Sequence, residues 1–177
     1  SRNGAVGMHA VSSLPAVSGA WQHRGGGAFF LNLDNWRLDT TLAHGLDALD
    51  PEIRVLDQSR IGPILCGDEA ALLGGPPVHA MIMQNANSAN VAPDSRAVRQ
   101  GLTREDLFVC VHEQFMTATA RCADIVLPAA MSFEYDDMYY GLGHTALTIG
   151  PALLDRYAQC RTNHEVVCGL AKRLGAR

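Results

Sequence analysis

Amide side chains gather directly behind a short apolar segment in "VHAMIMQNANSANVAPD", residues 78–94. The run 80–83 is apolar, and Gln84, Asn85, Asn87 and Asn90 follow it closely. Each amide carries both a hydrogen-bond donor and an acceptor, a combination that suits a nucleobase or a phosphoester. The alternative is turn chemistry, because Asn tolerates left-handed backbone conformations and caps its own backbone. The residue types by themselves leave both interpretations open.

A second polar group follows a second apolar segment. The segment "LFVCV", residues 107–111, leads directly into His112, Glu113 and Gln114. A carboxylate such as Glu113 can accept from two adjacent N–H groups, the pattern that guanine presents on one edge. Open parallel sheets bind ligands beyond the carboxyl ends of their strands. If the two segments are such strands, their polar ends predict a nucleotide cradle.

The surrounding elements predict an α/β fold with an open, mostly parallel sheet flanked by helices. Fully apolar strands alternate with helices, which is typical of a parallel sheet covered on both faces. The strands are expected at 78–83, 107–111, 124–127 and 144–149, and the helices between them at 94–100 and 115–122. Three upstream helices are expected at 4–19, 40–49 and 59–73, the first kinked or broken at Pro15. The breaker "GGPP", 74–77, separates a mainly helical and loop segment, 1–75, from a βαβ-type segment, 78–177.

The clearest helix is the last one. Thr162 and Glu165 have the spacing of a capping box, and Gly175 is a helix-stop signal. A buried stripe is expected between them at Val166, Val167, Leu170 and Leu174.

Other patterns do not predict a catalytic or metal centre in this chain. The sequence has no P-loop, HExxH motif or nucleophile elbow, and none of its five cysteines has CxxC spacing. The cysteines are expected to be structural thiols. The glycines of "HRGGGAFF", 23–30, are expected in a flexible connection, and the carboxylates Glu134, Asp136 and Asp137 on a solvated loop.

Composition limits the size and the partners of the chain. Its 177 residues, 47% of them hydrophobic, suffice for one sizeable core rather than two full domains. A net charge of −4 and the lack of a basic tract predict no nucleic-acid partner. No apolar run approaches the roughly 20 residues that span a bilayer, so membrane insertion is not expected. The first residue is Ser1, from which we expect a piece of a longer polypeptide. The chain is expected in the cytoplasm or the periplasm, with the cytoplasm preferred.

Three stretches resemble the molybdopterin oxidoreductase family of the dimethyl sulfoxide reductase type. The most specific is "QFMTATARCADIVLPAAMSFE", 114–134, in which Phe-Met-Thr, Thr-Ala and Ala-Asp-Ile-Val-Leu-Pro are family motifs. "NANSANVAPD", 85–94, is similar to the family's Asn-x-Asn-Pro-Ala loop, with Ser88 in place of Pro. Residues 2–30 are similar to its Asn-Gly helix and Gly-rich turn. The resemblance covers nearly the whole chain and is weakest over 31–77.

The resemblance implies a cofactor and a set of residues that contact it. Members hold molybdenum or tungsten on two molybdopterin guanine dinucleotides, and some also carry an iron–sulfur cluster elsewhere in the polypeptide. Residues 1–177 would form the second half of a discontinuous, Rossmann-like cofactor-binding domain that holds the guanosine end of one dinucleotide. The implied contacts are Asn85, Asn87, His112, Glu113 and Asn163. Tyr135 stands where some members carry a contacting Lys.

The resemblance also implies what lies elsewhere. The metal ligand, the substrate funnel and the site for an electron-transfer partner belong to the remaining domains of the parent polypeptide, so no catalysis is expected from this chain alone. One alternative is a non-catalytic relative, such as a domain of a respiratory Complex I large subunit. A stand-alone nucleotide-binding module is a third possibility, which the lack of a catalytic group disfavours.

Overall fold

The computed structural model describes residues 3–28, 41, 45, 47–140 and 146–175. The chain forms two compact units, Ser1–Leu49 with Tyr140–Ala146 and Asp50–Tyr139 with Leu147–Arg177. Helix α1, Gly4–Val17, and the 3-10 turn η1, Ala20–Gln22, belong to the first unit. Every predicted site residue lies in the second unit, which therefore carries the functional argument.

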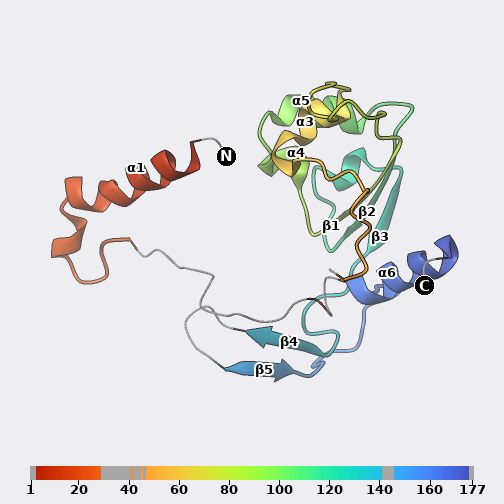
Figure 1. Ribbon diagram of the computed structural model, residues 1–177. Coiled ribbons are helices and arrows are strands. Elements are labelled where there is room, and N and C mark those ends of the chain that lie inside the picture. Colours follow the sequence, from red (N-terminus) through yellow and green to blue (C-terminus); the bar gives the residue numbers. More distant parts are fainter. Residues whose placement is uncertain (1–2, 29–40, 42–44, 46, 141–145, 176–177) are drawn as a thin grey trace. The chain divides into compact units, whose positions relative to one another are not determined.

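A three-stranded parallel sheet is the centre of the second unit (Figure 1). Its strands are β1, Ala80–Gln84, β2, Phe108–Glu113, and β3, Ile125–Pro128, in the order β1-β2-β3. Both pairings are parallel, with Gln84 opposite His112 and Glu113 opposite Pro128. The predicted α/β fold with a parallel sheet is confirmed.

Two helices cover one face of this sheet. Helix α3, Ile61–Leu65, and helix α5, Ser95–Leu102, contribute to a core with strand residues Met83, Val109 and Val111. Alternate strand residues point to the same face, so these three side chains lie together. Gly101 permits the helices to approach closely, because a Cβ there would lie 2.3 Å from the Cβ of Leu65.

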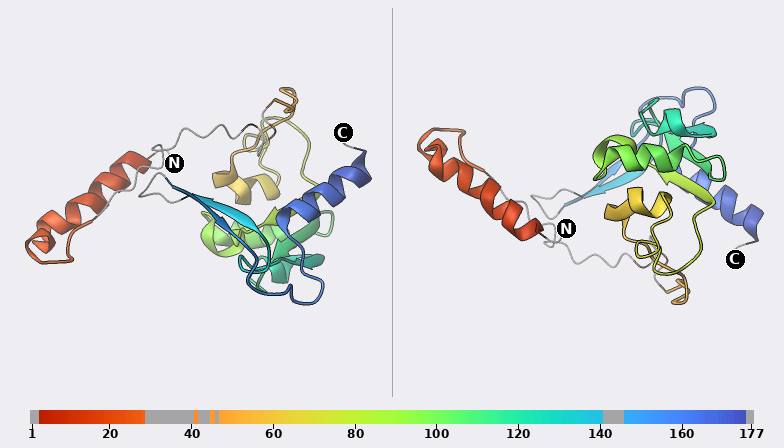
Figure 2. Two further views of the ribbon diagram at one scale, coloured as in Figure 1. Left: turned by 90° about the horizontal axis from the view of Figure 1, so that it is seen from below. Right: turned by 90° about the horizontal axis from the view of Figure 1, so that it is seen from above.

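Helix α6, Asn163–Leu174, lies against the opposite face. Its side chains Val167, Leu170 and Ala171 border a groove with Ile82 and Gln84, which alternate with Met83 along β1. In both views of Figure 2, α6 (blue) lies away from α3 (yellow) and α5 (green). Helices thus flank both faces of the sheet, as the sequence predicts.

The caps of α6 follow the sequence closely. Thr162 Oγ1 accepts from the Glu165 N–H at 3.2 Å, and Glu165 Oε2 accepts from the Thr162 N–H at 2.9 Å. Gly175 ends the helix with φ +73°, a left-handed conformation that favours glycine. The predicted capping box and helix stop are both confirmed.

Several predicted elements differ in extent. The helix expected at 59–73 is limited to the 3-10 turn η3, Gln58–Arg60, and α3, because the chain turns at Gly67 with φ +85°. The helix expected at 115–122 is reduced to the 3-10 turn η4, Ala120–Cys122. Helix α1 continues two residues past Pro15 without a break. Most of the helix expected at 40–49 lies outside the described residues.

Strands β4, Asp137–Tyr140, and β5, Leu147–Gly150, form a separate two-stranded sheet and run in opposite directions (Figure 1). Asp137 therefore lies on a strand and not in the expected loop. Strand β5 confirms the strand predicted near 144–149, although residues 144 and 145 lie outside the described part of the chain. No helix among the described residues is long and apolar enough to cross a membrane.

Candidate functional site

The carboxyl edge of the parallel sheet brings the predicted site residues together. Asn85 and Asn87 follow β1, and His112 and Glu113 end the neighbouring strand β2. A parallel bridge between Ala129 and Arg161 adds the segment before α6 to the far side of β3. In this bridge Arg161 N–H donates to Pro128 O at 3.1 Å, and Ala130 N–H donates to Arg161 O at 2.9 Å. Asn163 therefore also begins its helix at this edge.

The loop after β1 is held by a buried hydroxyl group. Thr119, which is 0% exposed, donates from Oγ1 to Asn87 Oδ1 at 3.0 Å and accepts from the Ala89 N–H at 3.0 Å. Its own N–H also donates to Asn87 Oδ1, at 3.3 Å. Asn87 is the residue before the short helix α4, Ser88–Val91. Its side-chain oxygen thus fixes the loop, while its amide N–H groups have no partner among the described residues.

A pocket of about 540 Å³ lies beside this loop. We call it the neutral pocket, because no charged side chain lines it; its lining residues are Gln58, Ser59, Asn85, Ala86, Asn87, Ser88, Val91, Ala92 and Pro93. Asn85 is exposed and has φ +51°, a left-handed conformation that Asn tolerates. The turn chemistry considered for these amides is therefore present in this loop, and their contact with a ligand stays a prediction.

His112 is completely buried and connects two parts of the edge. Its Nε2 lies 3.1 Å from the carbonyl oxygen of Arg161, and its Nδ1 lies 3.3 Å from Gln84 Nε2. A carbonyl only accepts, so we assign the ring proton to Nε2 and the acceptor role to Nδ1. The ring joins the end of β1 to the segment before α6. Its predicted contact with a cofactor stays a prediction, beside this structural role.

Glu113 keeps one carboxylate oxygen available. Its Oε1 accepts from the Gln114 N–H at 2.7 Å, whereas no described residue donates to Oε2. Gln114 Nε2 donates to Ala130 O at 3.1 Å, which links the end of β2 to the chain beyond β3. The half-buried Glu113 carboxylate can therefore accept further hydrogen bonds at the sheet edge.

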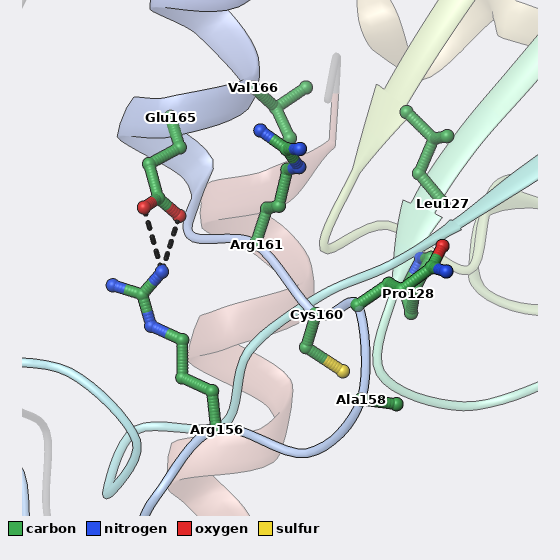
Figure 3. Close-up of a pocket in the computed structure, with 9 residues that line it drawn as sticks. Leu127, Pro128, Arg156, Ala158, Cys160, Arg161, Glu165 and Val166 are labelled. Atoms are coloured by element: carbon green, nitrogen blue, oxygen red, sulfur yellow. Dashed lines mark hydrogen bonds and ion pairs between the residues drawn. The ribbon is translucent and has the colours of Figure 1, made fainter.

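A second pocket, also about 540 Å³, lies between the end of β3 and the start of α6 (Figure 3). We call it the charged pocket; its lining residues are Leu127, Pro128, Arg156, Ala158, Gln159, Cys160, Arg161, Glu165 and Val166. Arg156 Nη1 donates to both Glu165 oxygens, at 2.7 and 2.8 Å. These bonds, together with the Thr162 N–H, lower the pKa of Glu165 to about 2.

Arg161 is the functional candidate that the sequence analysis missed. Its backbone is held by the bridge to β3, but its guanidinium has no partner among the described residues. Figure 3 shows the side chain extending alongside Val166 at the border of the charged pocket. Asn163 is exposed on the first turn of α6, where free N–H groups favour an anion. The position of Arg161 two residues before Asn163 is the only sequence signal that could have found it.

Tyr135 lies outside both pockets. Burial raises the pKa of its phenol, and the nearby Asp137 and Tyr139 act in the same direction. It remains protonated at neutral pH and offers a neutral hydrogen-bond donor, whereas the Lys that some family members carry at this position is a charged donor.

The sequence comparison decides the family. The family model described as molybdopterin oxidoreductase matches residues 9–173. This chain belongs to the molybdopterin oxidoreductase family. Among the relatives, the probable oxidoreductase YoaE of Bacillus subtilis is 36% identical over 174 residues, 98% of this chain and 25% of the relative. The periplasmic nitrate reductase of Desulfovibrio desulfuricans is 31% identical over 124 residues, 68% of this chain and 16% of the relative.

A comparison with solved structures agrees with this fold. Acetylene hydratase from Pelobacter acetylenicus superposes with a TM-score of 0.54 at 20% identity, over 65% of this chain and 15% of that one. The chain spans about a quarter of the length of YoaE. The description of the matched family names molybdopterin and an oxidoreductase, and the two relatives are described as a probable oxidoreductase and a reductase.

Proposed function

We propose that this chain forms part of a longer molybdenum or tungsten oxidoreductase and holds the guanosine end of one molybdopterin guanine dinucleotide. The observation that carries the proposal is the parallel bridge between Ala129 and Arg161. It brings the start of α6 to the same edge as the polar ends of β1 and β2. Ligands of open parallel sheets bind at this edge.

The free polar groups of the edge fit the parts of a guanine nucleotide. Glu113 Oε2 suits the adjacent N–H groups of guanine, and the amide N–H groups of Asn87 suit a ribose or a carbonyl oxygen. The unpartnered Arg161 guanidinium and the first turn of α6 suit a phosphate. Each pocket, at about 540 Å³, falls within the ~300–1,000 Å³ typical of small-molecule sites.

The cofactor and this chain would have different roles in the proposed function. The bound cofactor would supply the redox chemistry, and this chain would supply position and electrostatics. The nucleotide would be contacted by Asn85, Asn87, Glu113 and Asn163. The buried His112 would stabilise the arrangement of the sheet edge. We assign the metal ligand, the small-molecule substrate, the electron-transfer partner and any iron–sulfur cluster to the remaining domains of the longer protein.

Replacement of Glu113 tests the proposal in the full-length protein. A charge-assisted hydrogen bond contributes about 1.5–3 kcal/mol, which corresponds to roughly 10–150-fold in affinity. Glu113→Gln should therefore lower the guanine nucleotide and the molybdenum that remain per polypeptide after purification, and Glu113→Ala should lower them further. Nucleotide analysis and elemental analysis of the same preparation measure both quantities.

Glu105 provides the matched control for this experiment. It is exposed and precedes the same strand at its amino end, away from the proposed site. Glu105→Gln should leave the cofactor content unchanged. Full nucleotide and metal content in Glu113→Ala would contradict the assignment of the guanosine site.

A further inference from the structure

Strand β1 lies at one edge of the parallel sheet, with β2 as its only neighbour among the described strands (Figure 1). The Phe108 N–H donates to the His79 carbonyl oxygen at 2.9 Å, and every second residue of a parallel strand bonds to the same neighbour. The N–H and C=O groups of Ala80, Ile82 and Gln84 therefore point away from β2. No described residue bonds to these groups, which we call the outer edge of β1. Such an edge can pair with another strand.

Two apolar spaces lie beside β1, one on each face of the sheet. A pocket of about 200 Å³ lies on the face that α3 covers and has Ile61, Val78 and Met81 among its lining residues. The groove between β1 and α6 lies on the opposite face, measures about 480 Å³ and includes Ile82 and Leu170. No residue of β2 lines either space. Both spaces are therefore next to the outer edge of β1.

The apolar side chains of the groove are exposed in the described part of the chain. Ile82 and Val167 are each 51% exposed, and Leu174 is 82% exposed. The sequence predicts a buried stripe on α6, but among its members only Val166 is buried. Apolar side chains on a parallel strand and on a helix stripe are normally buried against another element, so the groove lacks a neighbour.

We propose that one further apolar β-strand docks on the outer edge of β1, and that it comes from the part of the longer polypeptide outside residues 1–177. Side chains alternate between the two faces of a strand, so a docked strand would fill the pocket with one set of side chains and the groove with the other. A helix would fill only one of the two spaces and would leave the outer edge unpaired. A strand buried in this way is apolar on both faces, which is the pattern of a central strand in a parallel sheet.

The source of the strand rests on the proposed function, in which this chain is part of a longer protein. The chain spans 25% of YoaE, so most of that relative has no counterpart in residues 1–177. The described strands of this chain already pair in two sheets, and the described residues of 1–49 include no strand. The docked strand is therefore assigned to the remainder of the longer polypeptide.

Amide hydrogen exchange at single-residue resolution tests the pairing in the full-length protein. With a docked strand, the Ile82 and Gln84 amides should be as strongly protected as the Met83 amide, which faces β2. The reference for an unpaired amide is Arg96 on the first turn of α5, where helix N–H groups lack an intrahelical partner. Protection of Ile82 and Gln84 no greater than that of Arg96 would overturn the proposal, even if the groove proved to be covered.

Thiol labelling tests the burial of the groove in the same protein. Ile82→Cys places a reactive group at the outer edge, and Thr103→Cys places one on the exposed end of α5 as the control. Labelling of a covered thiol requires local opening, so Ile82→Cys should react at least about 10-fold more slowly than Thr103→Cys. Peptide mass spectrometry separates these two thiols from the native cysteines. Slow labelling that becomes fast on dilution would assign the groove to a second copy of the protein and overturn the proposal.

The guanine nucleotide content of the same preparations separates this inference from the proposed function. Labelling of Ile82→Cys as fast as Thr103→Cys, with the nucleotide retained, would overturn the docking site and leave the guanosine site standing. Slow labelling together with protected Ile82 and Gln84 amides, in a protein that holds no guanine nucleotide, would support the docking site and contradict the guanosine site.

Discussion

The two pockets at the sheet edge have similar volumes but are built by different forces. The neutral pocket depends on hydrogen bonds among uncharged groups, with the buried Thr119 hydroxyl joining Asn87 and Ala89. The charged pocket is bordered by the exposed ion pair of Arg156 and Glu165 and by an unpartnered guanidinium at Arg161. Buried neutral bonds hold a shape, because breaking one leaves an unsatisfied polar group.

From this difference we expect the neutral pocket to contribute more to the stability of the fold and the charged pocket to contribute more to the binding of a ligand. In the neutral pocket, the polar groups of Asn87, Ala89 and Thr119 bond to one another. In the charged pocket, no described residue accepts a hydrogen bond from the Arg161 side chain. Exposed ion pairs contribute little to stability, and the Arg161 guanidinium adds a positive charge that no described residue compensates. His112 lies on β2, between β1 and β3, and bonds to Gln84 at the end of β1 and to the Arg161 carbonyl before α6. Three substitutions test this comparison.

Replacement of His112 should lower the stability most, because the ring bonds both to the end of β1 and to the segment before α6. His112→Ala would leave a cavity, remove the described partner of Gln84 Nε2 and remove one of the two donors to the Arg161 carbonyl. The expected loss is about 3 kcal/mol in the free energy of unfolding. Urea denaturation of the full-length protein measures it. His79 is an exposed histidine of the same unit, and His79→Ala should change stability by less than about 0.5 kcal/mol. Equal effects of the two substitutions would contradict the linking role.

Replacement of Thr119 should have an intermediate effect that is confined to the neutral pocket. Thr119→Val keeps the shape but removes the hydroxyl that bonds Asn87 Oδ1 and the Ala89 N–H. The buried Ala89 N–H would lose its acceptor and Asn87 Oδ1 would keep only the Thr119 N–H, which should cost about 2 kcal/mol. Amide hydrogen exchange should increase in the loop 85–91 and remain unchanged at the start of α6. The control is Thr103→Val on the exposed end of α5, which should be nearly neutral. Faster exchange at both pockets would show that they are not independent.

Replacement of Arg161 should have the smallest effect on stability. Its exposed side chain has no described partner, so Arg161→Gln should change the free energy of unfolding by less than about 0.5 kcal/mol. If the charged pocket binds a phosphate of the nucleotide, the same variant of the full-length protein should retain less cofactor after dialysis. Arg161→Lys should partly restore retention, because it keeps the charge but loses the planar guanidinium. A loss of stability with full retention of cofactor would reverse the roles assigned to this residue.

Features that depend on neighbouring residues were predictable from the sequence. Alternating apolar segments and helices predicted the parallel sheet, because each strand must bury two faces. The cap of α6 was predictable from Thr162, Glu165 and Gly175, since capping bonds join residues within one turn. The placement of Asn87 and Glu113 at the ends of neighbouring strands follows from the same local pattern.

Features that depend on distant residues were decided only by the tertiary structure. The segment 115–122 has helical spacing, but Thr119 in it bonds to Asn87, 32 residues away, and only a 3-10 turn forms. The burial of His112 depends on the Arg161 carbonyl, 49 residues away. The bridge from Ala129 to Arg161 joins residues 32 apart, and together with the His112 contact it brings the segment that carries Arg161 to the sheet edge. Such bonds form between elements that are already packed, so neither local propensity nor periodicity predicts them.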